Sequence, residues 1–362
     1  MFEPDQLPHI LPEYYTRARD MMSLQNRAYF LAGAGDEATL LANETAFSCA
    51  RIIPRPLRET GGGSTQISLL GQSHATPFMV APFAYHRLLD PLGETATARG
   101  AQAQSIKTVV SAQSSVDLAQ IRSAAASCDW FQLYWMGSRE RTLELAEIAL
   151  AAGYTVLVLT IDAPVQGVRD REIEAGFQLP PDVRAVNLSA FPATRFTPLI
   201  EGQSFVFDHI AHVLPNWRDV DWLMQSVAAP VLLKGILHPD DAARAASVGA
   251  AGVIVSNHGG RVLDRAPATL EMLLEVIKRV GSEYPVLMDG GIRRGVDIFI
   301  ALALGAKAVL IGRPVVCGLC VAGELGVSHV LRLLRDELEI AMLLSGCASI
   351  NDIHADMVHL KL

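Results

Sequence analysis

Residues 256–261 read Ser-Asn-His-Gly-Gly-Arg, which places a histidine and an arginine three residues apart. His258 is a candidate proton acceptor, because an imidazole exchanges protons near neutral pH. Arg261 could bind a carboxylate through two nitrogens of its guanidinium group. Asp162 could orient His258 and stabilise its protonated form. A histidine in a glycine turn is by itself more often a loop residue, so this interpretation depends on its companions.

Lys234 stands near the end of an apolar run that begins at Pro230. A buried lysine is unfavourable unless an anionic group meets it. One interpretation is a structural ion pair, for example with Asp162 or Asp289. The other is that Lys234 stabilises negative charge on a reduced cofactor. The residues alone allow both.

Two glycine turns near the end of the chain carry arginines. Residues 289–295 read Asp-Gly-Gly-Ile-Arg-Arg-Gly, and residues 312–313 read Gly-Arg. Backbone N–H groups and guanidinium groups together suit a phosphate dianion. The alternative is a pair of glycine turns with solvated arginines, and the choice depends on where the turns lie in the fold.

Eight short apolar runs, most of them rich in β-branched residues, alternate with segments of helical periodicity. Such alternation indicates a parallel sheet covered by helices on both faces. Eight units predict an α/β fold of the (β/α)8, or TIM barrel, class, and a doubly wound open sheet is the alternative. The predicted strands are Met79–Ala84, Lys107–Ala112, Trp130–Trp135, Thr155–Asp162, Pro230–Ile236, Gly252–His258, Pro285–Gly291 and Ala308–Pro314. The clearest predicted helices are Arg139–Ala152, Pro239–Val248, Ala268–Val280 and Asp297–Leu304.

Polar residues collect where six of these predicted strands end. In a (β/α)8 barrel the active site lies at the C-terminal ends of the strands, and phosphate often binds after the seventh and eighth strands. We therefore expect the two glycine turns to bind phosphate and His258 to lie in an active site. The residues at the six strand ends are Gln132, Tyr134, Thr160, Asp162, Lys234, Ser256, His258, Asp289, Gly291, Gly312 and Arg313.

The chain is predicted to be one domain over residues 1–362. Residues 1–78 form an N-terminal extension, with a helix at Leu7–Ala32 and a small hairpin at Gln66–Leu70 that caps the bottom of the barrel. Residues 79–346 form the barrel and residues 347–362 a C-terminal tail. A proline-rich loop from Leu179 to about Gln203 follows the fourth strand, and a loop of this length at that end is usually a lid or an interface.

Composition and charge exclude several classes of protein. The formal net charge is -8, which disfavours non-specific nucleic-acid binding. Five scattered cysteines and an N-terminus without an apolar signal region fit a cytoplasmic protein. Cys317 and Cys320 have Cys-x-x-Cys spacing, but they have no partners for zinc, so core packing in a small helix is expected and no metal site. The apolar stretch Ile298–Val316 is interrupted by charges and a proline, so no membrane span is expected.

At these residues the chain resembles the FMN-dependent 2-hydroxy acid oxidase/dehydrogenase family, whose members include glycolate oxidase, lactate oxidase, mandelate dehydrogenase and hydroxymandelate oxidase. The resemblance runs from about Tyr29 to Cys347. Its most specific parts are residues 256–264 and the turn that begins at Asp289, with residues 131–134 and 233–235 beside them. It implies that the protein binds FMN and oxidises a 2-hydroxy acid to the 2-oxo acid.

The resemblance also implies a role for each residue that would contact the substrate. His258 would remove a proton during oxidation, and Asp162 would support it. Tyr134 would contact the substrate hydroxyl. The substrate carboxylate would be held by Tyr29, Arg169 and Arg261.

The same resemblance implies where FMN would bind. Lys234 would face N1 of the flavin and stabilise the reduced ring. The ring would be lined by Pro82 to Ala84, Gln132, Thr160 and Ser256. The ribityl phosphate would be held by Asp289, Gly291, Arg293, Gly312 and Arg313.

The end of the second predicted strand, Val109-Val110-Ser111, departs from the family pattern. Many members carry a flavin-contacting serine followed by an aromatic residue there. Ser111 takes the place of the aromatic, substrate-side residue, so the pocket is expected to be wider and to suit a medium-chain or aryl, mandelate-like acid. Tyr85 could refill the space. Residues 81–85 and Trp135 look most like the hydroxymandelate oxidase branch.

The leading hypothesis is an oxidase for (S)-2-hydroxy acids that passes electrons to O2 and forms H2O2. The runner-up is a dehydrogenase that uses a quinone or a protein acceptor. Membrane-linked members carry a basic, apolar insertion after the fourth strand, whereas residues 191–207 here contain only Arg195 as a cation, and Ala84 also favours the oxidase. A non-redox phosphate-binding barrel and a non-catalytic barrel are further alternatives. The resemblance suggests a homotetramer.

Overall fold

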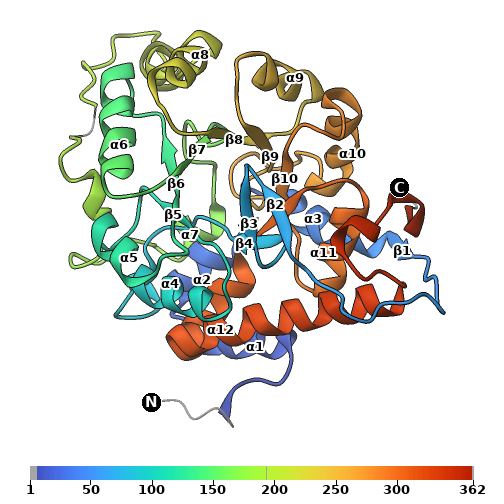
Figure 1. The fold of residues 1–362 in the computed structure, drawn as a ribbon. Helices are drawn as coiled ribbons and strands as arrows, with labels where there is room; N and C mark the ends of the chain where they lie inside the picture. The colour runs from blue at the N-terminus through green and yellow to red at the C-terminus, as the bar shows by residue number, and fades with distance from the viewer. Residues whose placement is uncertain (1–5, 193, 361–362) are drawn as a thin grey trace.

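Eight parallel strands form a closed barrel in the computed structural model, which describes residues 6–192 and 194–360 (Figure 1). The strands follow the order β4-β11-β10-β9-β8-β7-β6-β5, and a parallel bridge between Val80 and Thr108 closes the ring between its two ends. The barrel prediction is confirmed and the open sheet is excluded. The strands are β4 (Phe78–Val80), β5 (Val109–Ser111), β6 (Trp130–Tyr134), β7 (Val156–Thr160), β8 (Val231–Ile236), β9 (Gly252–Val255), β10 (Val286–Asp289) and β11 (Ala308–Ile311).

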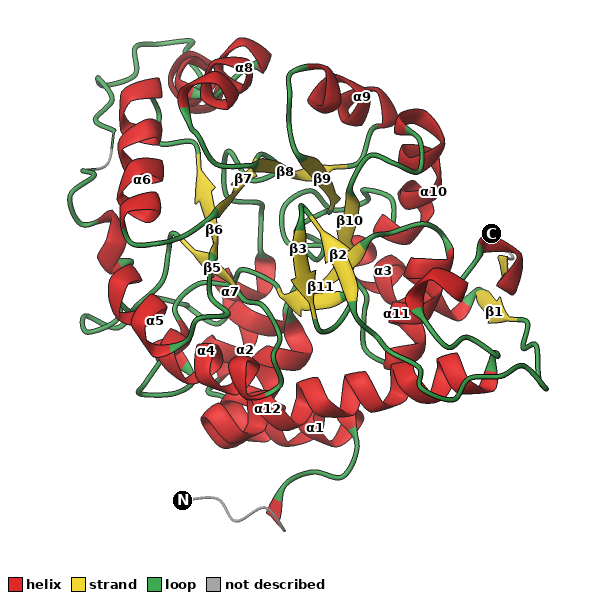
Figure 2. Ribbon diagram, viewed as in Figure 1, coloured by secondary structure: helices red, strands yellow, loops and turns green. Residues whose placement is uncertain are grey.

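Helices surround the barrel, as Figure 2 shows. Several of them start with an ordinary capping residue. Asp117 accepts hydrogen bonds from the N–H groups of Ala119 and Gln120 at the first turn of α5, and Ser138 caps α6 in the same way. The four helices predicted most clearly are present with ends shifted by at most two residues. The helices are α4 (Glu94–Ala103), α5 (Leu118–Ala124), α6 (Arg139–Ala151), α8 (Trp217–Ser226), α9 (Pro239–Ser247), α10 (Thr269–Val280), α11 (Gly295–Ala303) and α12 (Arg313–Leu344).

Side chains alternate between the inside and the outside of the barrel along each strand. In β6, Phe131 and Leu133 pack outward in the large core under the helices, whereas Trp130 packs inward. The hairpin of β2 (Ile67–Leu69) and β3 (Gln72–His74) closes the bottom, because Leu69 belongs to the same inner cluster as Trp130. The predicted hairpin cap is therefore confirmed.

The rest of the N-terminal extension differs from the prediction. The helix expected over Leu7–Ala32 is two helices, α1 (Leu11–Met21) and α2 (Leu24–Leu31). The chain is extended at Met22 (φ -69°, ψ 138°), and Ser23 then caps α2. A third helix, α3 (Ala38–Ser48), was not predicted. The strand β1 (Ala50–Ile52) pairs antiparallel with β12 (Val358–Leu360), so the C-terminal tail is ordered against the extension.

The cysteine pair lies at the start of α12, which is far longer than the small helix expected there. This helix has 32 residues and bends where Ala322 and Gly323 leave helical geometry. It is long and apolar enough to span a membrane by length and composition, but 61% of its most apolar stretch is buried. It packs against α1, α4 and α11, which is the environment of a core helix. Cys317 and Cys320 are free thiols, as core packing requires.

The long segment between β7 and α8 lies over the C-terminal end of the barrel. It contains one short α-helix, α7 (Asp170–Glu174), and single helical turns at Val186–Leu188, Phe205–His209 and Ile210–Val213. Several apolar side chains of the last part, including Phe205 and Phe207, are exposed. The loop predicted from Leu179 to about Gln203 is therefore the middle part of a larger covering segment.

Candidate active site

Two cavities meet at the C-terminal ends of the strands. The inner cavity lies among Pro82, Lys234, Asp289 and Arg313. The outer cavity is the larger of the two and lies under the covering segment between β7 and α8. The two cavities are neighbours, because they share part of their lining. The shared wall is formed by Tyr29, Gln113, Tyr134, Arg169 and His258.

The alternation of the strands explains why polar side chains line this mouth. In β6 the inward-facing Trp130 is followed two and four residues later by Gln132 and Tyr134, which therefore point into the barrel mouth. The same step of two leads from an inward apolar residue to a polar site residue in four other strands. These pairs are Val158 and Thr160, Leu232 and Lys234, Ile254 and Ser256, and Leu287 and Asp289.

His258 and Asp162 form the pair that the sequence predicted. The Nδ1 atom of His258 lies 2.9 Å from an Asp162 carboxylate oxygen. Burial raises the pKa of Asp162, but the nearby His258 and Lys234 outweigh it and hold that pKa below its usual range. The carboxylate therefore stays ionised and orients the ring so that Nε2 faces the cavity. A Cβ at Gly235 would lie 2.4 Å from Cβ of Asp162, so this approach requires glycine there.

Lys234 is buried and takes part in an ion pair. Its Nζ lies 3.1 Å from a carboxylate oxygen of Asp289 and donates a hydrogen bond of 2.9 Å to Ser256 Oγ. Burial lowers the pKa of Lys234, but Asp289 and Asp162 outweigh it, so the pKa is raised and the ammonium group is retained. Because Lys234 also lines the inner cavity, the structural ion pair and a contact with a bound ligand are compatible.

Arg261, Arg169 and Tyr29 are close together, as predicted. Nη1 of Arg261 donates to the backbone carbonyls of Tyr29 and Ala32, and its guanidinium lies 5.1 Å from the centre of the Tyr29 ring. Arg169 donates through Nε to the carbonyl of Arg261 at 3.1 Å. Burial raises the pKa values of the Tyr29 and Tyr134 phenols, so both hydroxyls are neutral hydrogen-bonding groups. This wall can bind a carboxylate and an adjacent hydroxyl.

Pro82, Ala84 and Ser111 form the floor of the inner cavity. Ser111 donates to Gln132 Oε1 at 3.0 Å, and the Gln132 amide nitrogen just behind it is buried without a hydrogen bond. Thr160 Oγ1, which is also buried and unpartnered, belongs to a residue that lines the outer cavity. Neither Gln132 nor Thr160 lines the inner cavity, so of the residues predicted to line the flavin ring only Pro82 to Ala84 lie on its surface. A flavin ring, which is flat with polar edges, fits this floor.

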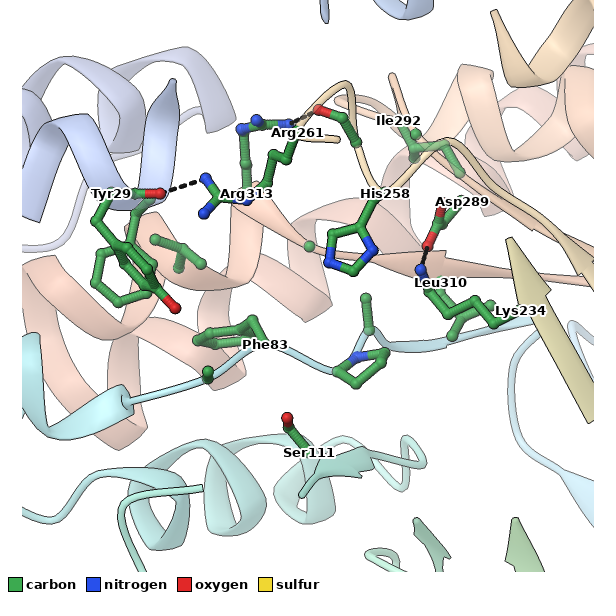
Figure 3. Close-up of a pocket in the computed structure, with 18 of the residues that line it drawn as sticks. Tyr29, Phe83, Ser111, Lys234, His258, Arg261, Asp289, Ile292, Leu310 and Arg313 are labelled. Carbon is green, nitrogen blue, oxygen red and sulfur yellow. Dashed lines mark hydrogen bonds and ion pairs between the residues drawn. The ribbon is translucent and has the colours of Figure 1, made fainter. Parts of the chain in front are cut away.

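The predicted phosphate turns lie at the inner cavity, as Figure 3 shows for Arg313 and Ile292. Arg313 donates to the carbonyls of Gly259 and Ala32, both at 3.0 Å, while its Nε is buried without a partner. Burial, together with the charges of Arg293 and Arg261, lowers the pKa of Arg313 to about 9. An anion placed here would relieve this crowding of cations, so a phosphate fits.

Two members of the predicted phosphate set have additional functions in the structure. Asp289 is the ion-pair partner of Lys234, and its other carboxylate oxygen is buried and free to accept a hydrogen bond. Gly291 is required by packing, because a Cβ there would lie 2.1 Å from the backbone oxygen of Asn43 in α3. Arg293 forms an ion pair of 2.5 Å with Glu44 of the same helix.

Sequence reasoning missed three residues of this site. Glu172 of α7 bridges Arg169 and Arg261, but in the sequence it stands in a charged run that looked solvent-exposed. Only its spacing of three from Arg169, on one helix face, was a signal. Asn43 forms reciprocal 2.8 Å hydrogen bonds with Asn257, next to His258, and no local pattern indicates it. Gln113 follows Ser111 by two residues, so continued alternation would have found it.

Comparison with known proteins gives concordant matches over almost the whole chain. Residues 18–360 match the model of the FMN-dependent dehydrogenase family. The chain is 45% identical over 359 residues to an L-lactate oxidase from Roseobacter sp. (strain GAI101), with 98% of this chain and 96% of that protein covered. It is 43% identical over 335 residues to a 4-hydroxymandelate oxidase from Amycolatopsis orientalis, with 92% and 93% covered. A crystal structure of mandelate oxidase is similar, with a TM-score of 0.89 at 40% identity and coverage of 98% and 99%.

Proposed function

Because this chain belongs to the FMN-dependent dehydrogenase family and its relatives are 2-hydroxy acid oxidases, we propose that it oxidises an (S)-2-hydroxy acid with a medium-chain or aryl side chain. In this proposal the electrons pass to O2 and form H2O2. FMN is the cofactor of the family and supplies the two-electron acceptor at the inner cavity. The family match removes the non-redox phosphate-binding barrel as an alternative.

Residues of the shared wall, together with Arg261 of the inner cavity, would bind and orient the substrate. Arg261 and Arg169 would hold its carboxylate through the N–H groups that the backbone and Glu172 leave free. Tyr134, neutral and buried beside them, would contact the hydroxyl. His258 would take a proton from the substrate through Nε2, and Asp162 would stabilise the resulting imidazolium at the 2.9 Å distance seen here.

The observation that supports a large substrate side chain is the outer cavity. It opens from the same wall that would hold the carboxylate, and its sides are mostly apolar. Ser111 leaves no aromatic ring between the cavities at the end of β5, and Tyr85 lines the outer cavity without filling it. The apolar lining includes Trp135, Met136, Ile161, Phe177, Leu188, Phe191, Phe196 and Val213.

Relatives do not choose between substrates. Identity to the L-lactate oxidases is 43–45%, as high as the 43% to 4-hydroxymandelate oxidase. The preference for a larger acid therefore rests on the shape and lining of the outer cavity. Cytoplasmic location and a homotetramer remain part of the proposal, and light scattering coupled to gel filtration of the purified protein tests the tetramer.

An anaerobic screen tests the substrate. The purified FMN-loaded protein is mixed with glycolate, L-lactate, 2-hydroxyoctanoate and both enantiomers of mandelate, and bleaching of the flavin absorbance is followed. We expect (S)-mandelate and the (S) enantiomer of 2-hydroxyoctanoate to bleach it with the highest second-order rate constants. Faster bleaching by glycolate, by L-lactate or by an (R) enantiomer would overturn the proposed substrate class.

The electron acceptor is tested with the best substrate under air. We expect one H2O2 for each substrate oxidised, measured with a peroxidase-coupled dye. Negligible peroxide together with rapid reduction of an artificial electron acceptor would instead show a dehydrogenase.

A further inference from the structure

Glu172 is a buried carboxylate placed between Arg169 of the shared wall and Arg261 of the inner cavity. One oxygen, Oε1, lies 2.9 Å from Nη1 of Arg169 and 3.3 Å from Nη2 of Arg261. The other oxygen lies 3.4 Å from the Gln166 amide nitrogen. The side chain is only 6% exposed. It therefore contacts both cations from the edge of the outer cavity, which it helps to line.

The position of this carboxylate offsets an electrostatic conflict. Arg169 and Arg261 are 11% and 15% exposed, and each disfavours the charge of the other in so enclosed a place. Burial, and next the charge of Arg169, lower the pKa of Arg261. Two buried cations are tolerated only when an anion pairs with them. Glu172 is the carboxylate that contacts both within the described residues.

The remaining contacts of the two arginines are made by the backbone. Arg261 Nη1 donates to the carbonyls of Tyr29 and Ala32 at the end of α2, and Arg169 Nε donates to the carbonyl of Arg261. Together with Glu172 these bonds fix both guanidinium planes. The N–H groups left over are those available to a ligand in the cavities. The orientation of Arg169 and Arg261 thus depends on an acidic residue that itself would not touch the reacting atoms.

The short helix α7 is anchored so that this one acidic side chain points inward. Phe177, just after α7, stacks on Tyr29 with ring centres 4.6 Å apart and an angle of 14°. Gln25 donates to the carbonyl of Gly176 at 3.1 Å, and Arg171 forms an ion pair of 3.0 Å with Glu37. The neighbours Ile173 and Glu174 are exposed. The orientation of α7 therefore turns Glu172, and not its neighbours, toward Arg169 and Arg261.

We propose that Glu172 is a positioning residue for substrate binding, which holds Arg169 and Arg261 in the arrangement that receives the carboxylate of a 2-hydroxy acid. The inference rests on the proposed function. If Glu172 only balanced charge, its removal would leave the wall more positive and would strengthen the binding of a carboxylate. If Glu172 positions the arginines, its removal weakens the binding of a carboxylate. The two cations then separate, and their N–H groups no longer point together at the ligand.

The test uses the FMN-loaded enzyme and Glu172→Gln, with Glu174→Gln as the matched control on the exposed face of the same helix. Oxidised enzyme is titrated with benzoylformate, a 2-oxo acid that cannot be oxidised further here, and binding is read from the change in flavin absorbance. We expect the dissociation constant to rise by about tenfold or more in E172Q, the size of one lost hydrogen bond to a charged group. It should be unchanged in E174Q. The neutral benzoylformamide should bind equally to all three proteins.

Unchanged or tighter binding of benzoylformate to E172Q would overturn the positioning role. An equal loss for the neutral amide would also overturn it, because it would show a general collapse of the cavity. If E172Q does not retain FMN, Glu172→Asp, which keeps the charge and shortens the reach, should still weaken benzoylformate binding at least threefold, and no change would refute the inference. Failure of the wild-type enzyme to bind benzoylformate would instead refute the proposed function, and the positioning role with it.

Discussion

His258 combines a strained backbone with a catalytic position. Its φ angle is 58°, in the left-handed region that non-glycine residues rarely adopt, and its backbone N–H is held by Ser256 Oγ at 3.0 Å. Such strain persists only where the surroundings impose it, and it often marks a functional site. The geometry turns the ring between Asp162 and the cavity, so the proton-accepting atom is already aimed at the place where the substrate would bind.

His258→Ala should therefore lose the chemistry and keep the fold. We expect FMN to remain bound, because His258 is not among the buried groups that form the floor, while bleaching by the best substrate slows by about 100-fold to 10 000-fold. Stopped-flow absorbance without oxygen measures this rate, and flavin content with the melting temperature confirms folding. Bleaching near the wild-type rate would remove His258 as the base.

Arg261→Lys tests the proposed contact between Arg261 and the substrate carboxylate. A lysine keeps the charge but cannot provide two parallel N–H groups, so we expect KM for the best substrate to rise by about tenfold. Arg279→Lys, whose side chain pairs with Asp240 at 2.8 Å on the exposed surface, is the matched control and should leave KM unchanged. Unaltered KM in R261K would identify Arg169 or Tyr29 as the main carboxylate contact.

Local periodicity separates the site residues that could be predicted from the sequence from those that could not. Gln132, Lys234 and Asp289 could be predicted because a strand repeats every two residues, so their places follow from apolar neighbours in the same run. Glu172 and Asn43 could not, because their partners Arg261 and Asn257 are distant in the sequence and only the folded chain brings them together.

At the scale of elements, α3 supports the loop after β9. Asn43 and Asn257 exchange two hydrogen bonds of 2.8 Å, and the same Asn43 oxygen accepts from Thr269 N–H at 3.2 Å at the start of α10. Asn257 Oδ1 also accepts from the N–H of Gly260. One buried side chain of the N-terminal extension thus connects α10 to the loop that carries His258, which the prediction of a simple preceding extension did not foresee.

Asn43→Ala should destabilise this junction strongly. It removes both hydrogen bonds between Asn43 and Asn257, whose side chain keeps only its bonds with Pro267 and Gly260, and it leaves the buried Thr269 N–H without its Asn43 partner. We expect a loss of about 3 kcal/mol in the free energy of unfolding. The midpoint of urea unfolding of the FMN-loaded protein measures it. Thr45→Ala, on the exposed side of the same helix, is the control, and its change should stay within about 0.5 kcal/mol. Equal midpoints for N43A and T45A would contradict the supporting role of Asn43.

At the scale of the whole molecule, the eight-unit pattern was enough to predict the barrel, because each unit repeats the same local signals. The pairing of β1 in the N-terminal extension with β12 in the C-terminal tail was not predictable. Each strand has three residues, and the two are far apart in the sequence. Pairing such short strands is favourable only after the barrel has brought them together, so no local signal for it exists in either segment.

Two buried histidines contribute to the way in which the stability of the fold depends on pH. His74 and His86 are each 4% exposed, and burial lowers the pKa of both below 6.5. For His74 the charge of Lys107 adds to this effect. The unfolded chain, with ordinary histidines, therefore binds more protons than the folded chain just below pH 6.5. By linkage, their contribution is complete above pH 6.5 and is lost as the pH falls from there toward the lower folded-state values.

We therefore expect the free energy of unfolding to decline between pH 6.5 and 5.0, by at most about 1.4 kcal/mol per pH unit for each buried histidine. His86→Gln should flatten this decline, because glutamine does not titrate. The imidazole that it replaces is hydrogen-bonded to the Thr97 hydroxyl and to the Phe83 carbonyl. His354→Gln, at an exposed position, should leave the slope unchanged. Urea unfolding at several pH values measures the slopes. Identical slopes for H86Q and the wild type would show that buried His86 does not govern acid sensitivity, and His74 beside Lys107 and Asp129 would then be the remaining buried histidine to test.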